Sequence, residues 1–279
     1  DSHAKIQHNE WILQVGGGKS RTFQKGHYDD MIRIKDHYLL PNGSQIEHLI
    51  DEIYPQLTGT VKYFQERAIL TPKNVHVDYI NDRILDQISV EPTDEKTYYS
   101  VNTIADPEQN ALHTTEFLDS IEHTGLPQHR IKLKVGAPIM LLRNLDPTQG
   151  LANGTRLRVE KLHDHLIVAK IVTGKHAGTI VCIPKINISL SDSDLPFQLQ
   201  RLQFPVKLCF VMTINKAQGQ SLKRVGVYLP DPVFSHGQLY VAISRVKNPN
   251  GLKILIHDST IPGEQGSFTR NVVYPEVLI

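Results

Sequence analysis

Apolar residues recur at helical spacing in several stretches near the start of the chain. Residues 4–15 can form a helix, which the run Gly16-Gly17-Gly18 ends, as glycines do at helix C-termini. Two later stretches each have a single apolar face. In residues 45–57 the face consists of Ile46, Leu49, Ile50, Ile53 and Tyr54. In the stretch after Asn74 it consists of Val77, Ile80, Ile84, Leu85 and Ile88. These faces predict helices that pack against a core.

The segment 131–203 has a different pattern. Short runs that alternate or are wholly apolar are separated by Gly, Pro, Asn or Asp at intervals of roughly ten residues, which predicts a small β-barrel. The runs are Ile131–Val135, Pro138–Leu142, Arg156–Leu162, Leu166–Val172 and Thr179–Ile183. Before this segment, residues 98–101 predict a strand and residues 114–122 a helix. An α/β pattern precedes the segment and resumes at Phe204.

Polar residues directly follow two strand-like runs. The run 206–212 leads into Thr213, Asn215, Lys216 and Gln218. The run 68–71 ends at Thr71 and is broken by Pro72, before the helix that Asn74 can cap. Open α/β sheets bind ligands where strands end and helices begin. The sequence therefore predicts a site at this edge, followed by a strand at 224–229 and a helix at 237–244 that ends on Arg245.

Composition narrows the function little. Hydrophobic residues make up 40% of the 279 residues and charged residues 21%, as in ordinary globular proteins. A net charge of +1 neither favours nor excludes nucleic acid, because a local groove of Lys and Arg suffices to bind phosphates. Cys182 and Cys209 both lie in apolar runs, which predicts core thiols in a reducing compartment. No run reaches the ~20 apolar residues of a membrane span.

Two short motifs resemble ligand sites and are rejected. Gly18-Lys19-Ser20 follows a predicted helix, and Leu13 stands where a phosphate loop needs glycine. His163-Asp164-His165 lies at a predicted hairpin turn, and no second pair of ligands occurs at metal-site spacing. We therefore predict no metal site in the chain.

Longer motifs resemble a known family. TINKAQGQSL (213–222) followed by GQLYVAISRV (237–246) resembles motifs V and VI of superfamily 1 DNA helicases. The resemblance is closest to the Pif family and, within it, to the helicase part of Helitron transposons. It extends to ERAILTPKN (66–74), LKVGAPIMLLRNLD (133–146) and GLANGTR (150–156).

The resemblance implies an α/β fold of the RecA-like motor type with an inserted SH3-like barrel. Residues 1–60 would end a first motor domain, and residues 61–130 and 204–258 would form the second. The barrel would span 131–203, and 259–279 would be a tail at the surface.

The resemblance also implies site residues. Arg245 would be an arginine finger that stabilises charge during phosphoryl transfer; the alternative is a solvated arginine at a helix end. Gly219 and Gln220 would contact the nucleotide, although Gly219 can be a plain turn glycine. Thr71, Asn74, Thr213, Asn215, Lys216 and Gln218 would grip the sugar-phosphate backbone of single-stranded DNA without reading its sequence; the alternative is a polar surface loop.

This sequence departs from the usual family pattern at two positions. Asn215 stands where His is common and Ala217 where Ser is common, although the Helitron branch often has these residues. Asn153, in Asn153-Gly154-Thr155, would lie near DNA or form a mere hairpin turn.

An ATP motor also needs a phosphate loop and an acidic Mg²⁺ ligand, and neither pattern occurs in this sequence. In the family both lie upstream, so we expect the chain, which begins with Asp1, to be part of a longer protein. ATP and Mg²⁺ would be held mainly by that missing part. The alternatives are a nucleic-acid-binding fragment without catalysis and a barrel that binds protein. The family implies a nuclear monomer that is not bound to membranes.

Overall fold

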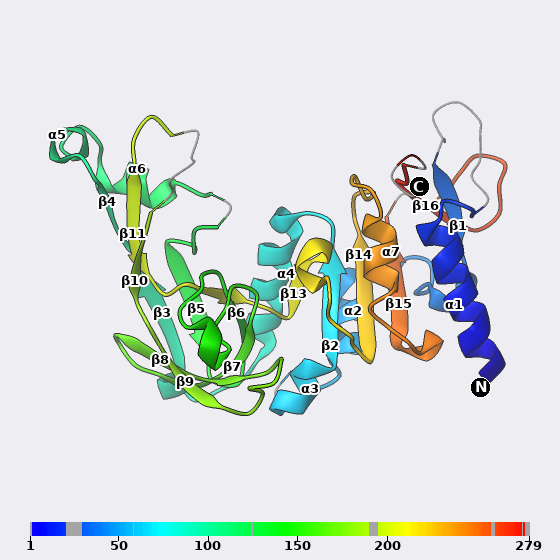
Figure 1. The fold of residues 1–279 in the computed structure, drawn as a ribbon, viewed down its shortest axis with the longest axis horizontal. Helices are drawn as coiled ribbons and strands as arrows, with labels where there is room; N and C mark the ends of the chain where they lie inside the picture. The colour runs from blue at the N-terminus through cyan, green and yellow to red at the C-terminus, as the bar shows by residue number, and fades with distance from the viewer. Residues whose placement is uncertain are drawn as a thin grey trace. The chain divides into compact units, whose positions relative to one another are not determined.

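A computed structural model describes residues 2–20, 30–57, 59–123, 125–189, 195–257, 260–274 and 276. The chain forms two compact units. Unit 1 contains 1–57, 65–84 and 210–279, and unit 2 contains 58–64 and 85–209. Figure 1 shows the elements of each unit.

A parallel sheet forms the centre of unit 1. Its strand order is β13 (Val211–Thr213), β2 (Arg67–Thr71), β14 (Arg224–Leu229) and β15 (Leu252–Ile256). The strands are nearly continuous apolar runs, as expected for a parallel sheet that is covered on both faces. Helix α2 (Ile46–Ile53) packs against β14, where a Cβ on Gly226 would lie 2.9 Å from Ile53 Cγ1. Glycine at this position therefore allows the helix to approach closely.

The predicted helices of unit 1 are confirmed. Helix α1 (Ser2–Gly16) ends where Gly18 adopts a left-handed φ of 65°, so the Gly-Lys-Ser motif is a helix terminus, not a phosphate loop. Helix α4 begins in this unit and spans Asn74–Gln87. The apolar positions predicted for the α4 region are all buried. The helix predicted over 45–57 is shorter than expected and ends at Ile53.

The prediction of a surface tail is wrong for its central part. Strand β16 (Ser267–Arg270) pairs antiparallel with β1 (Met31–Ile34), and Phe268, Thr269 and Asn271 are buried. The partner strand lies more than two hundred residues earlier, so local patterning does not reveal the pairing. The ends of the predicted tail, at 258–259, 275 and 277–279, lie outside the described residues.

Unit 2 contains a five-stranded antiparallel sheet. Its order is β12 (Val206–Leu208), β6 (Pro138–Leu141), β7 (Arg156–Leu162), β8 (Leu166–Ile171) and β9 (Ile180–Pro184). Four of the five predicted runs are strands of this sheet, and the fifth, β5 (Arg130–Lys134), pairs with β3 (Glu95–Tyr99). The hydrogen-bonded strand order runs from β12 to β9 and does not pair these two end strands with each other. A closed SH3-like barrel therefore stays a prediction.

Two details of the sequence analysis need correction. The run 206–212 is not one strand, because β12 belongs to unit 2 and β13 to unit 1. Cys209 is buried as predicted, whereas Cys182 is exposed, because the alternation along β9 turns Val181 and Ile183 inward.

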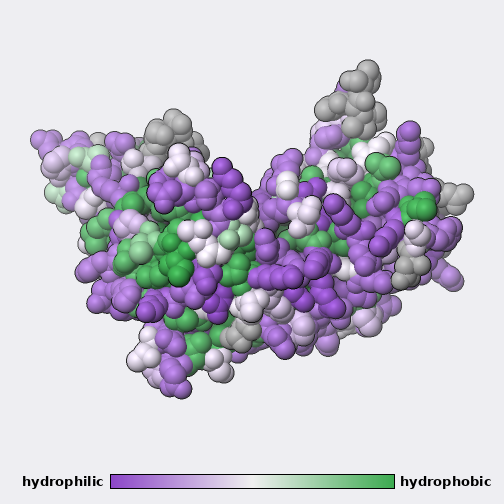
Figure 2. All heavy atoms as spheres, turned by 60° about the horizontal axis from the view of Figure 1, so that its bottom comes forward, coloured by the Kyte–Doolittle hydropathy of each residue, from purple (hydrophilic) through white to green (hydrophobic). Residues whose placement is uncertain are grey.

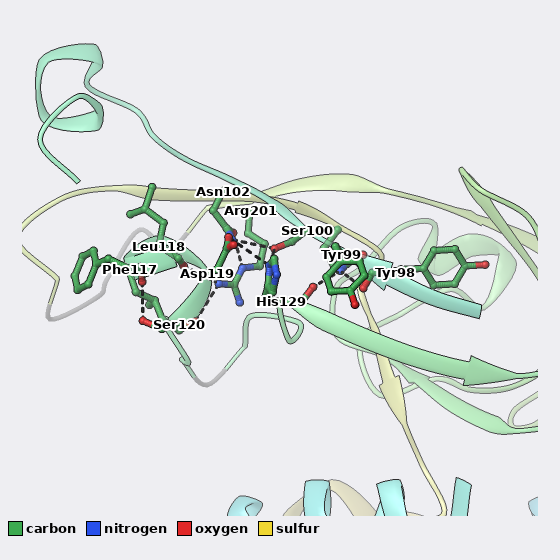
Figure 3. Close-up of polar contacts among 12 residues, drawn as sticks. Tyr98, Tyr99, Ser100, Asn102, Phe117, Leu118, Asp119, Ser120, His129 and Arg201 are labelled. Atoms are coloured by element: carbon green, nitrogen blue, oxygen red, sulfur yellow. Dashed lines mark hydrogen bonds and ion pairs between the residues drawn. The ribbon is translucent and has the colours of Figure 1, made fainter. Parts of the chain in front are cut away.

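A second sheet of unit 2 is built on a buried arginine. Strands β10 (Ile186–Ser189), β11 (Leu199–Gln203) and β4 (Val101–Ile104) form it, and α6 (Thr115–Ser120) packs against β4. The side chain of Arg201 is 1% exposed and donates to Asn102 Oδ1 and to the carbonyl oxygen of Leu118 (Figure 3). It also donates to the carbonyl oxygens of Pro127 and Ile121. Residues 85–130, assigned to the motor domain from the sequence, therefore pack within unit 2.

The remaining described elements are short. They are α3 (Val61–Gln65), α5 (Pro107–Asn110), α7 (Gln238–Ile243) and the 3₁₀ turns η2 (Asp36–Tyr38), η3 (Pro92–Asp94), η4 (Pro147–Gln149), η5 (Ile214–Ala217) and η6 (Pro249–Gly251). Several large apolar side chains of unit 2 stay exposed, among them Tyr99, Val101, Ile180 and Leu202. Apolar surface is visible on this unit in Figure 2.

Candidate functional site

The two polar strand ends predicted from the sequence lie side by side. Strands β2 and β13 run parallel, and Thr71 is the register partner of Thr213. The segments that follow both strands therefore leave the sheet at the same edge, which we call the carboxyl edge of unit 1. The contacts predicted for the individual residues at this edge stay a prediction.

The predicted strand contacts differ in accessibility. Asn74, Asn215, Lys216 and Gln218 are exposed, and Thr213 is half-buried. Thr71 is 0% exposed, and its Oγ1 has no hydrogen-bond partner among the described residues. The Thr71 hydroxyl is therefore not available at this surface, whereas the exposed cation and amides can meet a ligand.

A short 3₁₀ turn follows β13. This turn, η5, leads to Gly219, whose φ of 79° lies in the left-handed region. This conformation favours glycine, because a Cβ would be strained there. The Gln220 side-chain amide donates to the carbonyl oxygen of Lys216 at 3.1 Å, which closes the turn. The turn is thus held by its own polar groups.

Within the part of the chain that the structure describes, Arg245 is held only by neutral oxygens. Its Nε donates to Val241 O at 2.9 Å, its Nη2 to Ser244 Oγ at 2.8 Å and its Nη1 to Gln220 O at 3.1 Å. Burial lowers the pKa of the guanidinium, which nevertheless stays charged at neutral pH. Among the described residues no carboxylate pairs with Arg245. Its positive charge is therefore not neutralised by a partner within the described chain.

Backbone contacts fix the segment around Arg245. Its carbonyl oxygen accepts from Leu222 N at 2.9 Å. The next carbonyl, that of Val246, accepts from His8 Nε2 at 3.1 Å. His8 is 1% exposed, and its Nδ1 lies 2.7 Å from Tyr38 Oη. Because Val246 O can only accept, Nε2 carries the proton, and neutral His8 accepts from Tyr38. Sequence reasoning missed His8, since nothing in α1 marks it.

A second group missed by sequence reasoning lies near the start of α4. Asp231 Oδ2 lies 2.8 Å from His76 Nε2 and 3.2 Å from Lys73 Nζ. Lys73 stands within the quoted TPKN motif, but its partner Asp231 is more than a hundred residues away. Only the fold brings them together.

Asn153 belongs to unit 2 and is exposed. Its N–H donates to Asn144 Oδ1 at 2.7 Å, and Gly154 has a φ of 88°. These features are those of a tight turn in which the Asn153 side chain is presented to solvent. The structure is compatible with both alternatives weighed for this residue.

The described ranges contain neither a metal-ligand cluster nor a helix that could span a membrane. No group of three or more His, Cys, Asp or Glu side chains there is arranged to hold a metal ion. His163, Asp164 and His165 form the hairpin turn between β7 and β8, where Asp164 pairs with Lys96 at 2.5 Å. None of the described helices combines the length and apolarity that crossing a membrane requires.

Sequence comparisons place these features in a family context. The model of the DNA helicase Pif1 2B domain matches residues 116–162. The ATP-dependent DNA helicase PIF1 of Xenopus laevis is 31% identical over 220 residues, covering 76% of this chain and 32% of that protein. The ATP-dependent DNA helicase Pif1 of Bdellovibrio bacteriovorus is 27% identical over 251 residues, covering 88% of this chain and 53% of that protein. The chain thus spans about a third to a half of these curated relatives.

Solved structures have the same fold. The Pif1 helicase from Candida albicans superposes with a TM-score of 0.57 and 23% identity, over 91% of this chain and 54% of that one. The Pif1 helicase from Bacteroides in complex with ADP-AlF3 and ssDNA gives 0.52 and 22%, over 75% of this chain and 44% of that one. In sequence the chain is thus similar to part of the Pif1 DNA helicases, and it shares the fold of the solved Pif1 structures.

Proposed function

We propose that the chain is the C-terminal part of an ATP-dependent 5′-to-3′ DNA helicase. It supplies Arg245 as an arginine finger and the carboxyl edge of unit 1 as part of a track for single-stranded DNA. The observation that carries the proposal is the fork of Arg245, which lies on the turn at Gln220 and has no carboxylate partner among the described residues. A guanidinium that no carboxylate neutralises keeps its charge for an anionic ligand.

The chemistry of a guanidinium suits the proposed role. It is permanently charged and forks onto two phosphate oxygens, so it neutralises charge that builds up during phosphoryl transfer. Arginine fingers contribute ~10³–10⁵ in rate in related reactions. Gly219 and Gln220 lie on the same turn as the Arg245 contact, so a nucleotide that reaches the finger comes close to both.

The exposed groups at the carboxyl edge suit a strand of any sequence. Lys216 supplies a cation, and Asn74, Asn215 and Gln218 supply amides that can bind phosphate or sugar. Contacts of this kind fix the position of a nucleic acid without reading its bases. The structure of the Pif1 helicase from Bacteroides holds ADP-AlF3 and ssDNA. It supports a nucleotide and single-stranded DNA as the ligands proposed for this chain.

The described residues do not fit a catalytic Mg²⁺ ion. The sequence lacks a phosphate loop and a strand that ends in Asp-Glu, and no acidic cluster is arranged as a metal site within the described ranges. ATP and Mg²⁺ would therefore be held mainly by a part of the helicase outside this chain. The isolated chain should show no ATPase above background with single-stranded DNA. An ATP turnover that Arg245→Ala abolishes would contradict this.

The missing phosphate loop also favours a second candidate, a nucleic-acid-binding fragment that performs no catalysis. Both candidates share the carboxyl edge and predict binding of single-stranded DNA by a monomer. They differ in whether a phosphate-loop domain is encoded upstream, which the upstream genomic sequence decides. A Helitron origin and a nuclear location are proposals that rest on the resemblance alone. A third candidate is that the predicted barrel binds protein, which peptide capture with the full chain would test.

A further inference from the structure

Asp231 joins a lysine and a histidine side chain at the start of α4. Its Oδ2 is shared by His76 Nε2 at 2.8 Å and Lys73 Nζ at 3.2 Å. All three side chains are partly exposed, at 26% for His76, 39% for Asp231 and 47% for Lys73. A solute anion can therefore reach Lys73 and His76. We call this group the Asp231 clasp.

The clasp lies at the carboxyl edge of unit 1. Strand β2 ends at Thr71, two residues before Lys73, and its parallel neighbour β14 ends at Leu229, two residues before Asp231. On the other side of β2, the parallel β13 leads into η5, which carries Lys216. Because neighbouring strands lie ~4.8 Å apart, Lys73 and Lys216 leave the sheet from adjacent strands of one edge.

The clasp has the chemistry of an occupied phosphate site. The ammonium of Lys73 is a donor that suits phosphate as well as carboxylate, and exposed ion pairs are weak and exchangeable. The hydrogen bond from His76 and then that from Lys73 lower the pKa of Asp231. Asp231 is therefore ionised at neutral pH and carries the charge that a phosphate would bring.

We propose that Lys73 is a further phosphate contact of the single-stranded DNA track and that Asp231 is a built-in competitor for it. A backbone phosphate replaces the Asp231 carboxylate on Lys73 when a strand lies along the edge. The carboxylate takes Lys73 back when the strand leaves, so Asp231 weakens the grip and favours release. This inference rests on the proposed binding of single-stranded DNA at this edge.

Binding of a labelled oligothymidylate to the full chain, titrated at several salt concentrations, tests the proposal. Asp231→Asn should raise the affinity about three- to fivefold, the range that breaking an exposed ion pair allows. Lys73→Ala should flatten the salt slope by about 0.7, the value for one phosphate contact to a single strand. In the Lys73→Ala background, Asp231→Asn should lose most of its gain.

Glu66→Gln is the matched control. Glu66 pairs with Lys223 at 2.6 Å where β2 and β14 begin, so this change removes one negative charge at the opposite edge of the same sheet. It should leave the affinity unchanged. An equal gain from Glu66→Gln, or a full gain from Asp231→Asn without Lys73, would show a net-charge effect and overturn the proposal.

The same titration separates this inference from the proposed function. If the wild-type chain does not bind the oligonucleotide, both are wrong. If it binds and Lys216→Ala weakens binding, while Asp231→Asn matches wild type, the track stands and only the exchange at Asp231 is wrong.

Discussion

Arg245 donates from Nη1 to the carbonyl oxygen of Gln220 at 3.1 Å, which joins the end of α7 to the turn after η5. The carbonyl of Arg245 in turn accepts from Leu222 N at 2.9 Å. The side chain and the backbone of one residue are thus tied to the same turn. A guanidinium held in this way is positioned before any ligand arrives, which is how preorganised charge acts most effectively.

Removing the Arg245 side chain should therefore cost stability as well as function. Arg245→Ala loses three hydrogen bonds, at roughly 1 kcal/mol for each bond between neutral partners and somewhat more for a charged donor. Partial exposure reduces this sum, so we expect the free energy of unfolding to fall by about 1–3 kcal/mol. Urea denaturation measures it.

Arg245→Lys is the informative companion, because lysine keeps the charge but cannot fork. It should recover less than half of the stability that Arg245→Ala loses. If both variants unfold at the urea concentration of the wild type, the observed contacts do not hold the side chain.

The sequence predicted this neighbourhood but not its contacts. Apolar runs located β2, β13 and β14, since buried parallel strands are continuous in hydrophobicity. The residues at their ends then followed from the rule that parallel strands end at one edge. The family motif pointed to Arg245, whereas its partners at Gln220 and Val241 depend on side-chain geometry that no spacing reveals.

The features that were missed depend on distant segments. The burial of β16 depends on β1, and the clasp on Asp231 depends on the pairing of β2 with β14.

Thr71 was predicted as a surface contact but is fully buried. The alternation within β9 exposes Cys182, although the run looks apolar throughout. Local pattern does not determine which side of such a strand faces water.

His8 should make the stability of unit 1 depend on pH. Burial, opposed by the hydrogen bond to Val246 and reinforced by Lys35, lowers the pKa of His8 from 6.5. The folded state therefore binds its proton less readily than the unfolded state. Stability from neutral His8 is present above about pH 6.5 and falls as the pH decreases toward the folded-state pKa.

The difference in unfolding free energy between wild type and His8→Gln isolates this term, because the other histidines are common to both proteins. It should shrink between pH 7.5 and pH 5 in urea titrations. Tyr38→Phe removes the hydroxyl that donates to His8 Nδ1 and should lower stability at neutral pH. A pH-independent difference would mean that His8 is not held in the neutral form.

Substitution of Arg201 should strongly destabilise the β4–β10–β11 sheet. Arg201→Met leaves four oxygen acceptors without this donor, three of them in buried hydrogen bonds and one in a part-buried bond. At roughly 1 kcal/mol for each hydrogen bond, the loss is about 3–4 kcal/mol. Hydrogen exchange of β4 and β11 amides should accelerate in the variant. Arg130→Met, at an exposed position in the same unit, should change little; equal effects would mean that Arg201 is not the centre of this sheet.

Lys216 should carry a measurable share of strand binding. It is an exposed cation on η5, beside the end of β2, and a phosphate contact releases counterions when it forms. Lys216→Ala should therefore weaken binding of oligothymidylate and flatten the dependence of log affinity on log salt by about 0.7. Lys223→Ala is the control, since Lys223 is exposed at 69% and precedes β14 at the opposite edge of the sheet. If the two variants weaken binding equally, the grip on the strand is a diffuse property of the surface charge. If only Lys216→Ala does so, the strand lies along the carboxyl edge, where a motor must hold it to move it.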